Sequence, residues 1–281
     1  MNRYRLLSCL CLGLSFASLS ACTVVVDGDR VQCKTDSDCT VRGTAYAGSV
    51  CTESICHPDP TWACLDETPA TEDPTGTVHV DMSMEDLISQ KPVPSVRFTL
   101  CAKLDANCLF PIAQYQSNEA GKLNVEMPAG FDGYFQTDGG GVYPTMFFPP
   151  STRKQRASST LPMVPTSFFG IMFSQISGPV SEDRSVVMTT ALDCQARPAT
   201  GMALSSPQAD ERTVTYVIQG GLPSRTAGTT DATGNGGFVN IKAGSVVVTS
   251  TMAGNNRPVG TVAVQTRPGY LTMVLVMPTG S

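Results

Sequence analysis

The chain has 281 residues, of which 41% are hydrophobic and only 15% are charged, whereas soluble domains average about 25% charged residues. Its formal net charge of −5 argues against a nucleic-acid partner, because nucleic acids are bound through clustered cations. Two histidines and one tryptophan leave few side chains for acid–base or metal chemistry. The 25 glycines, 20 prolines and 11 cysteines instead indicate a turn-rich chain that folds outside the cytoplasm.

The N-terminus has the order of a secretory signal peptide. Arg3 and Arg5 precede an apolar stretch that runs from Leu6 to about Ser20. This stretch is shorter than the roughly 20 apolar residues that a membrane span needs. We therefore expect residues 1–21 to be removed on export.

The sequence Leu19-Ser20-Ala21-Cys22 resembles the lipobox of bacterial lipoproteins. The resemblance implies that Cys22 begins the mature chain and carries diacylglycerol on its sulfur and a further acyl chain, such as palmitate, on its amino group. Several acyl chains anchor a protein stably where one is marginal. We expect a lipid-anchored protein of the cell envelope, and Thr23 in place of the aspartate of inner-membrane retention favours the outer membrane. An ordinary signal peptide with a chance cysteine at the cut is the alternative.

Eight cysteines remain beyond Cys22, and an even number in an exported chain indicates disulfides. They are Cys33, Cys39, Cys51, Cys56, Cys64, Cys101, Cys108 and Cys194. Within the anchor and module at 22–58, residues 31–58 have few large apolar side chains, so we expect two bridges among the four cysteines of that stretch in place of a core. A four-cysteine zinc site is the alternative, but the two-residue spacing of zinc knuckles is absent. Residues 31–58 resemble small modules of exported proteins of myxobacteria, a resemblance that implies no activity.

The next segment, 59–76, is rich in proline, threonine and acidic residues and is typical of a semi-rigid linker. Cys101 and Cys108 flank a turn-prone tetrapeptide, so a bridge between them would fix the register of the preceding strand. Cys64 and Cys194 then remain, and their bridge would tie the linker to the C-terminal half.

From residue 77 onward, short alternating apolar runs are broken by glycine and proline, which predicts antiparallel strands in a sandwich. The runs are 78–80, 93–101, 123–127, 131–135 and 142–148, then 185–188, 238–241 and 271–277. The later segment repeats the turns of the earlier one, and both close on apolar strands, 142–148 and 271–277. We expect two tandem domains, 77–150 and 184–281, joined by a connector at 151–183.

The order of a strand, Lys/Arg-Pro, an alternating strand, an Asp/Asn-x-x-Gly turn, an apolar strand and Ala-Gly resembles the carboxypeptidase regulatory-like (transthyretin-like) family. The matching elements are Lys91-Pro92 and Arg197-Pro198, Asn118 to Gly121 and Asp231 to Gly234, and Ala129-Gly130 and Ala243-Gly244. The resemblance covers about 77–149 and 184–278. It implies an all-β fold of two Greek-key antiparallel β-sandwiches that are not catalytic themselves, and carbohydrate binding only by analogy with starch-binding relatives.

One short helix is expected between the sandwiches. Its apolar residues recur with a helical period at Phe168, Phe169, Met172, Phe173 and Ile176. Thr166 or Ser167 would cap its start, and Gly178-Pro179 would stop it. Burial of this stripe against neighbouring strands is the favoured interpretation, with a membrane-facing or partner-binding helix as the alternative.

Catalytic and metal motifs are incomplete throughout. Ser151-x-x-Lys154 lacks the companion motifs of penicillin-interacting enzymes, and His57 and His79 lie in no triad context. The Asp231 turn resembles half of a calcium loop but has Lys242 at its twelfth position, so a hairpin turn is favoured. We therefore expect no catalytic residue, no metal and no cofactor.

The expected function is a non-catalytic, lipid-anchored envelope protein that is structural or binds an envelope protein or polysaccharide. Exposed aromatic residues near loops, namely Tyr134, Phe135 and Tyr143, are candidates for stacking on sugars, and core positions are the alternative. A second hypothesis is an accessory module of an envelope enzyme or transport system, with catalysis by a partner.

Overall fold

The structure is a computed structural model that describes residues 31–42, 46, 49–66, 75–150, 156–254 and 256–279. The predicted signal peptide and Cys22 lie outside these ranges. Within them, no helix is both long and apolar enough to cross a membrane. The chain is mostly β, and the prediction of β-sandwiches behind a small disulfide-rich module is confirmed.

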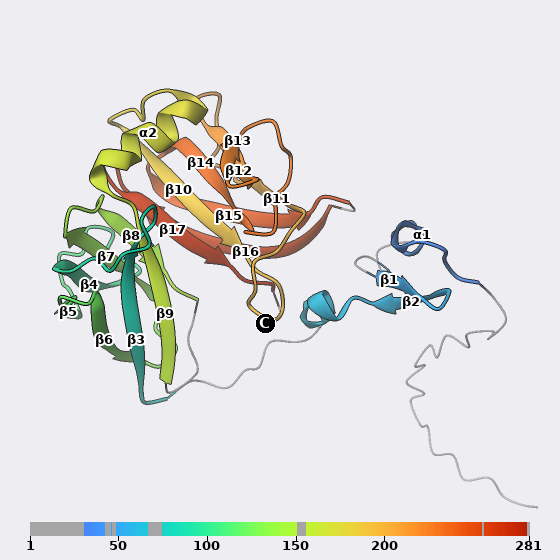
Figure 1. Ribbon diagram of the computed structural model, residues 1–281, viewed down its shortest axis with the longest axis horizontal. Helices are drawn as coiled ribbons and strands as arrows, with labels where there is room; N and C mark the ends of the chain where they lie inside the picture. Colours follow the sequence, from blue (N-terminus) through green and yellow to red (C-terminus); the bar gives the residue numbers. More distant parts are fainter. Residues whose placement is uncertain are drawn as a thin grey trace, which may run out of the picture.

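The N-terminal module is a helix and a hairpin with almost no core. It contains α1 (Asp36–Thr40), β1 (Ser49–Thr52) and β2 (Ile55–Pro58), and the two strands pair antiparallel. The Asp38 carboxylate accepts the backbone N–H of Thr35 and so caps the start of α1. The 3₁₀ helix η2 (Pro60–Asp66) follows and leads the chain toward the sandwiches (Figure 1).

Four disulfides join the eight cysteines, in the pairs Cys33–Cys51, Cys39–Cys56, Cys64–Cys194 and Cys101–Cys108. The first two cross-link α1 and the irregular segment before it to the hairpin, and these bonds replace the missing core. The third spans 130 residues and fastens η2 to the C-terminal half. The fourth closes the turn that follows a central strand of the first sandwich.

The first sandwich has a three-stranded and a four-stranded layer. The three-stranded layer has the order β6-β3-β9, in which β3 is antiparallel to β6 and parallel to β9. The four-stranded layer has the order β8-β7-β4-β5 and is antiparallel throughout. The strands are β3 (Thr77–Asp86), β4 (Val96–Ala102), β5 (Ala113–Gln116), β6 (Lys122–Pro128), β7 (Gly133–Gly139), β8 (Thr145–Phe148) and β9 (Arg156–Met163).

The second sandwich has a five-stranded and a three-stranded layer. Its first layer is β13-β12-β14-β10-β17, in which β10 is antiparallel to β14 and parallel to β17. Its other layer is β11-β15-β16. The strands are β10 (Arg184–Ala191), β11 (Met202–Ser205), β12 (Val214–Gln219), β13 (Leu222–Ser224), β14 (Asn235–Lys242), β15 (Gly244–Met252), β16 (Arg257–Thr266) and β17 (Leu271–Val276).

The two sandwiches share one sheet. Strand β8 of the first pairs parallel with β17 of the second, from Thr145 opposite Leu271 to Phe148 opposite Val274. This pairing joins a layer of each sandwich into a nine-stranded sheet (Figure 1). The tandem units are therefore continuous in hydrogen bonding, although the sequence pattern treats them as separate domains.

The internal repeat is visible as one strand junction present in both sandwiches. The Met84 N–H donates to the carbonyl oxygen of Gly121, and the Ala191 N–H donates to that of Gly234. Both glycines have positive φ, +68° and +65°. A Cβ at Gly121 would lie 2.7 Å from the Met84 oxygen, and one at Gly234 would lie 2.5 Å from the Ala191 oxygen. The repeated Asp/Asn-x-x-Gly turn is thus required by a left-handed backbone against a neighbouring strand.

The structure differs from the expected connector in two places. Residues 156–163, which we placed in the connector, form β9, and the counterpart of β17 is β9, not the strand at 142–148. Each of β9 and β17 lies parallel to the first strand of its own unit. Strand β9 is at the edge of its sheet and contains three serine or threonine residues and a proline, so its apolar alternation is weak. We propose that the first sandwich extends to Met163.

The predicted helix is α2 (Thr166–Ser177), and the burial of its stripe is confirmed. Phe169, Phe173 and Ile176 are buried in a cluster with residues of β10, β12, β14 and β17. The N-cap position is occupied by Pro165, without a side-chain cap, so the prediction of a Thr166 or Ser167 cap is wrong. Gly178 ends the helix at a φ of +76°.

Candidate functional site

The feature with the most recognition chemistry is the outer face of β4, β5 and β7. Successive side chains of a strand point to opposite faces, and in β4 those of Val96, Phe98 and Leu100 point into the core, where each is fully buried. Arg97 and Thr99 therefore lie on the opposite face. Strands β5 and β7 add three glutamines and an aspartate to this face at the same level.

The register of these strands places the polar side chains in two rows. Arg97 lies between Gln116 of β5 and Asp138 of β7, and Thr99 lies between Gln114 and Gln136. We call this set the polar face, defined by the residues Arg97, Thr99, Gln114, Gln116, Gln136 and Asp138. A hollow of about 560 Å³ lies over the row that contains Arg97.

Charge on the polar face is balanced by a short ion pair. Arg97 Nη2 lies 2.5 Å from Asp138 Oδ1, and this hydrogen bond raises the pKa of the guanidinium. Arg97 is therefore charged at every physiological pH. Both side chains keep donor or acceptor atoms for a ligand, because one contact does not satisfy a guanidinium or a carboxylate.

The turn between β16 and β17 brings an aromatic ring to the side of the polar face. Gln136 Nε2 donates to the Tyr270 hydroxyl at 3.2 Å, and Arg267 donates to Gln136 Oε1 at 2.5 Å. The Arg267 guanidinium also lies 4.0 Å from the centroid of the Tyr270 ring. Gln136 is thus held by residues about 130 positions away in the chain.

Two of the three aromatic residues expected to stack on sugars are core residues, and the third is half-buried. Tyr134 and Phe135 are buried, and Tyr143 stacks on Phe169 of α2 with ring centroids 3.5 Å apart. Burial raises the pKa of Tyr134, whose neutral hydroxyl donates to the Asp105 carbonyl oxygen at 2.6 Å. The predicted alternative, core positions in strands, is therefore confirmed for Tyr134 and Phe135, whereas Tyr143 is half-buried and precedes β8.

Gln114, Gln116, Gln136 and Tyr270 were not singled out from the sequence. The Gln-x-Gln spacing of β5 was the available signal, but its meaning depends on the register with β4.

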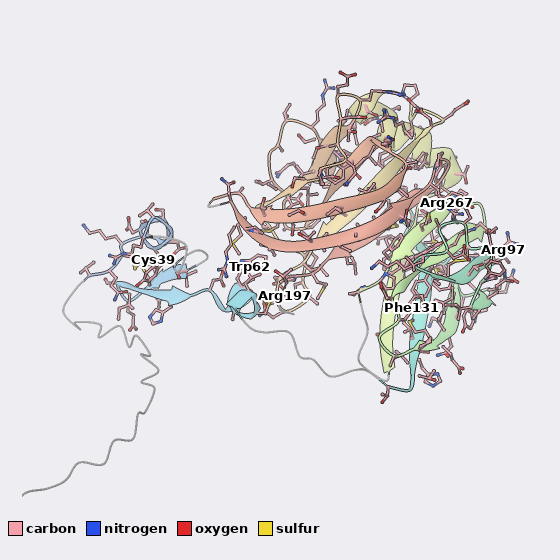
Figure 2. The ribbon with its side chains drawn as sticks, turned by 180° about the vertical axis from the view of Figure 1, so that it is seen from behind. Cys39, Trp62, Arg97, Phe131, Arg197 and Arg267 are labelled. Atoms are coloured by element: carbon pink, nitrogen blue, oxygen red, sulfur yellow. A yellow bond between two sulfur atoms is a disulfide. The ribbon has the colours of Figure 1, made fainter. Side chains whose placement is uncertain are left out.

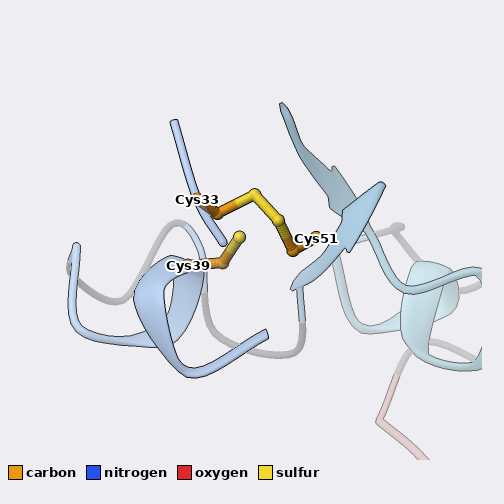
Figure 3. Close-up of side chains that lie close together, drawn as sticks. All are labelled: Cys33, Cys39 and Cys51. Atoms are coloured by element: carbon orange, nitrogen blue, oxygen red, sulfur yellow. A yellow bond between two sulfur atoms is a disulfide. The ribbon is translucent and has the colours of Figure 1, made fainter. Parts of the chain in front are cut away.

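The cysteines of the module bring three sulfur atoms within 4.8 Å of one another, at Cys33, Cys39 and Cys51. Figure 3 shows the Cys33–Cys51 bond with the Cys39 sulfur beside it. Cys39 is bonded to Cys56. Zinc binds thiolates, and these sulfurs are oxidised, so the arrangement is two adjacent disulfides and not a zinc site.

Two of the remaining sequence candidates, His79 and Asp231, contact neighbouring residues of the fold. His79 is exposed on β3 and lies 3.4 Å from Glu126. The Asp231 carboxylate accepts the N–H and hydroxyl of Thr233 and the N–H of Gly220, so its oxygens hold the turn. Ser151 and Lys154 lie outside the described residues.

A second polar hollow, of about 590 Å³, lies on the outer face of β6, β3 and β9. Asn124 Nδ2 donates to Asp81 Oδ1 there at 2.7 Å. The residues that line it include no aromatic side chain. This second hollow serves as a control for the polar face, on which the aromatic residue Tyr270 contacts the Gln136 amide.

No family model and no curated protein matches the sequence. Solved structures align over most of the chain at low identity. The shaft pilin SpaA of Lactobacillus rhamnosus GG aligns with 73% of this chain and 99% of its own, at 11% identity and a TM-score of 0.23. A protein of Bacteroides uniformis proposed to bind carbohydrate aligns with 67% of this chain and 98% of its own, at 8% identity and a TM-score of 0.27. A streptococcal ancillary pilin aligns with 72% of this chain and 69% of its own, at 12% identity and a TM-score of 0.21. Similarity at this level supports no inference about function.

Proposed function

We propose that this chain is a non-catalytic, lipid-anchored binding protein of the cell envelope that recognises a polysaccharide through the polar face. The observation that carries the proposal is the arrangement of amides, a guanidinium and a carboxylate in register on three strands, with Tyr270 at the side. Sugars present hydroxyl groups that both donate and accept, and amide side chains offer both functions to them.

The placement of these groups suits an extended polymer. The hollow over Arg97 is open and shallow, and all of its lining residues except Ser95 belong to β4, β5 and β7. Strand residues keep their positions without a ligand, so little conformational entropy is lost on binding. A small molecule would instead be expected in an enclosed, largely apolar pocket.

The disulfides and the N-terminal motif support the location. Four disulfides persist only in an oxidising compartment. The proposed anchor at Cys22 would hold the sandwiches near the outer membrane, with the module and the linker as spacer. Mass spectrometry of the mature N-terminus tests the anchor by itself, and we expect an acylated Cys22 and a non-acylated, unprocessed precursor for Cys22→Ala.

Binding is tested on the full chain with a polysaccharide array, followed by affinity electrophoresis in gels that contain each polysaccharide retained on the array. Gln136→Ala removes contacts to both Tyr270 and Arg267. We expect it to weaken retention roughly tenfold, because a lost hydrogen bond costs about 1 to 1.5 kcal/mol.

Asn124→Ala is the matched control, since it removes an amide from the other polar hollow. It should leave retention unchanged. A wild-type chain that binds nothing on the array, or equal losses for the two variants, would contradict polysaccharide binding by the polar face. Neither result bears on the anchor.

A further inference from the structure

Exposed apolar side chains cluster at one place on the molecule. Nine large hydrophobic residues are exposed among the described residues, and four of them lie between positions 104 and 112. We call these four the apolar tip, namely Leu104, Leu109, Phe110 and Ile112, with exposed fractions of 95%, 71%, 82% and 50%. Single exposed apolar residues are ordinary, whereas a contiguous group marks an interaction site.

The backbone under the apolar tip is held rigidly. The Cys101–Cys108 disulfide closes the loop at its base. The Tyr134 hydroxyl donates to the Asp105 carbonyl oxygen at 2.6 Å, and the Ile112 N–H donates to the Leu100 carbonyl oxygen at 2.8 Å. Because these bonds exist before any contact is made, the tip can be buried without the cost of ordering a loop.

The same loop pairs several of its own backbone donors. The Asp105 carboxylate accepts the Phe110 N–H at 2.7 Å, and the Asp105 carbonyl oxygen accepts the Cys108 N–H at 3.0 Å. Pro111 has no N–H to satisfy. Hydrocarbon offers no hydrogen-bond partner, so only a segment with internally paired backbone groups enters it cheaply. A protein partner would not require this property.

Charge around the tip is also paired internally. Lys103 Nζ lies 2.9 Å from Asp132 Oδ1, and the backbone N–H of Phe110 is foremost among the groups that lower the pKa of Asp105. Attraction to anionic lipid requires free cations, and the segment from 101 to 112 has no cation other than Lys103. The apolar tip therefore offers no attraction to anionic lipid, and we take zwitterionic lipid as its occupant.

We propose that the apolar tip inserts into the interfacial layer of a lipid bilayer and forms a second membrane contact, apart from the N-terminus. Residues 22–31 extend at most about 35 Å, so an anchor at Cys22 would keep the module close to the bilayer. This inference depends on neither polysaccharide binding nor acylation, because the tip residues carry it.

The chain has a single native tryptophan, Trp62, so the test moves that fluorophore to a chosen surface position. In a Trp62→Phe background, Phe110→Trp places the only tryptophan on the tip, and Leu222→Trp places it at another exposed site, 69% exposed on β13. Both full-length variants are bound to vesicles of phosphatidylcholine that contain brominated chains, which quench tryptophan only within the membrane. We expect a blue shift and at least roughly twofold stronger quenching at position 110 than at position 222.

Equal quenching at the two positions, or none at either, overturns the proposal and leaves a protein partner as the occupant of the tip. Any other attachment to the vesicle is common to both variants, so a failed anchor does not alter the comparison. Replacing part of the phosphatidylcholine with phosphatidylglycerol should not increase quenching at position 110. An increase would contradict the charge argument. Unchanged far-UV circular dichroism shows that both variants are folded.

Discussion

Four hydroxyl groups are buried without a hydrogen-bond partner among the described residues, on Ser185, Thr189, Ser250 and Thr272. Thr272 is fully buried in β17, next to the Met146 position of β8 across the shared sheet. An unpaired buried hydroxyl costs free energy, because it loses its bonds to water. At Thr189 and Thr272 the side chain contributes a β-branched shape that suits a strand, while its unpaired hydroxyl costs stability.

Thr272→Val should therefore raise the free energy of unfolding, by about 1 kcal/mol, since valine keeps the shape and removes the unpaired hydroxyl. Urea denaturation measures the change. Thr261→Val on the exposed side of β16 is the control and should stay within about 0.5 kcal/mol of wild type. A loss of stability at Thr272 would mean that its hydroxyl has a partner in solution.

Arg184 carries a nearly buried charge, with 10% of its side chain exposed, and donates to Asp210 at 2.7 Å. This hydrogen bond, followed by one from Thr213, lowers the pKa of Asp210 from 3.8 to about 2. A carboxyl group with a depressed folded-state pKa adds stability above its unfolded pKa and loses it as the pH falls through the folded pKa. The window for Asp210 is therefore pH 4 down to about 2.

Asp210→Asn should be less stable than wild type at pH 6, and the difference should shrink between pH 4 and pH 2. Urea midpoints across that range provide the measurement. Asp132→Asn, which removes the partner of the exposed Lys103, is the comparison and should show a much smaller difference at pH 6. A difference for Asp210→Asn that is independent of pH would contradict the pairing with Arg184.

At the scale of elements, the strand junction at Gly121 shows why the turn is repeated in the second sandwich. Gly121 has a positive φ and a neighbouring carbonyl oxygen where a Cβ would lie. Gly141 has a similar φ of +75° but open space around it. A comparison of the two positions therefore separates the cost of backbone strain, which both share, from the cost of a steric clash, which arises only at Gly121.

Gly121→Ala should destabilise the chain by about 1 to 3 kcal/mol more than Gly141→Ala, because only the former adds a steric clash to the strain of a left-handed residue. Thermal unfolding of both variants tests this. Equal losses would show that the backbone at Met84 moves aside freely.

At the scale of the whole molecule, the Cys64–Cys194 disulfide and η2 attach the N-terminal module to the second sandwich. Trp62 and Leu65 of η2 pack against a cluster that includes Ala191, Ala199 and Met202. Figure 2 labels Trp62 and Arg197 at this contact, where the Cys194 N–H donates to the Thr61 carbonyl oxygen. Since Trp62 is the only tryptophan, its fluorescence reports on this contact alone.

The Cys64→Ser and Cys194→Ser double variant should release η2, shift Trp62 emission to longer wavelength and increase its quenching by acrylamide. The sandwiches should keep their far-UV circular dichroism, because no strand depends on this bridge. The Cys101→Ser and Cys108→Ser double variant is the control and should leave Trp62 unchanged. If Trp62 stays protected without its disulfide, apolar packing alone holds η2.

The sequence by itself determined the class of fold, the strands with strong alternation, the helix at 166–177 and the repeated glycine turn. These features depend on periodicity and on local backbone geometry, which neighbouring residues encode. It also led to the disulfide pairing of Cys101 with Cys108, because the intervening turn is short. Strand β9 was not predicted from the sequence, since an edge strand has little apolar alternation to detect.

Only the tertiary structure decided how the pieces meet. The parallel pairing of β8 with β17 makes one sheet of two sandwiches, and no local pattern specifies a partner more than 120 residues away. The polar face likewise exists only once register places Arg97 between Gln116 and Asp138 and folding brings Tyr270 to Gln136. A strand's alternation says which side chains face outward, and long-range packing decides which of them become neighbours.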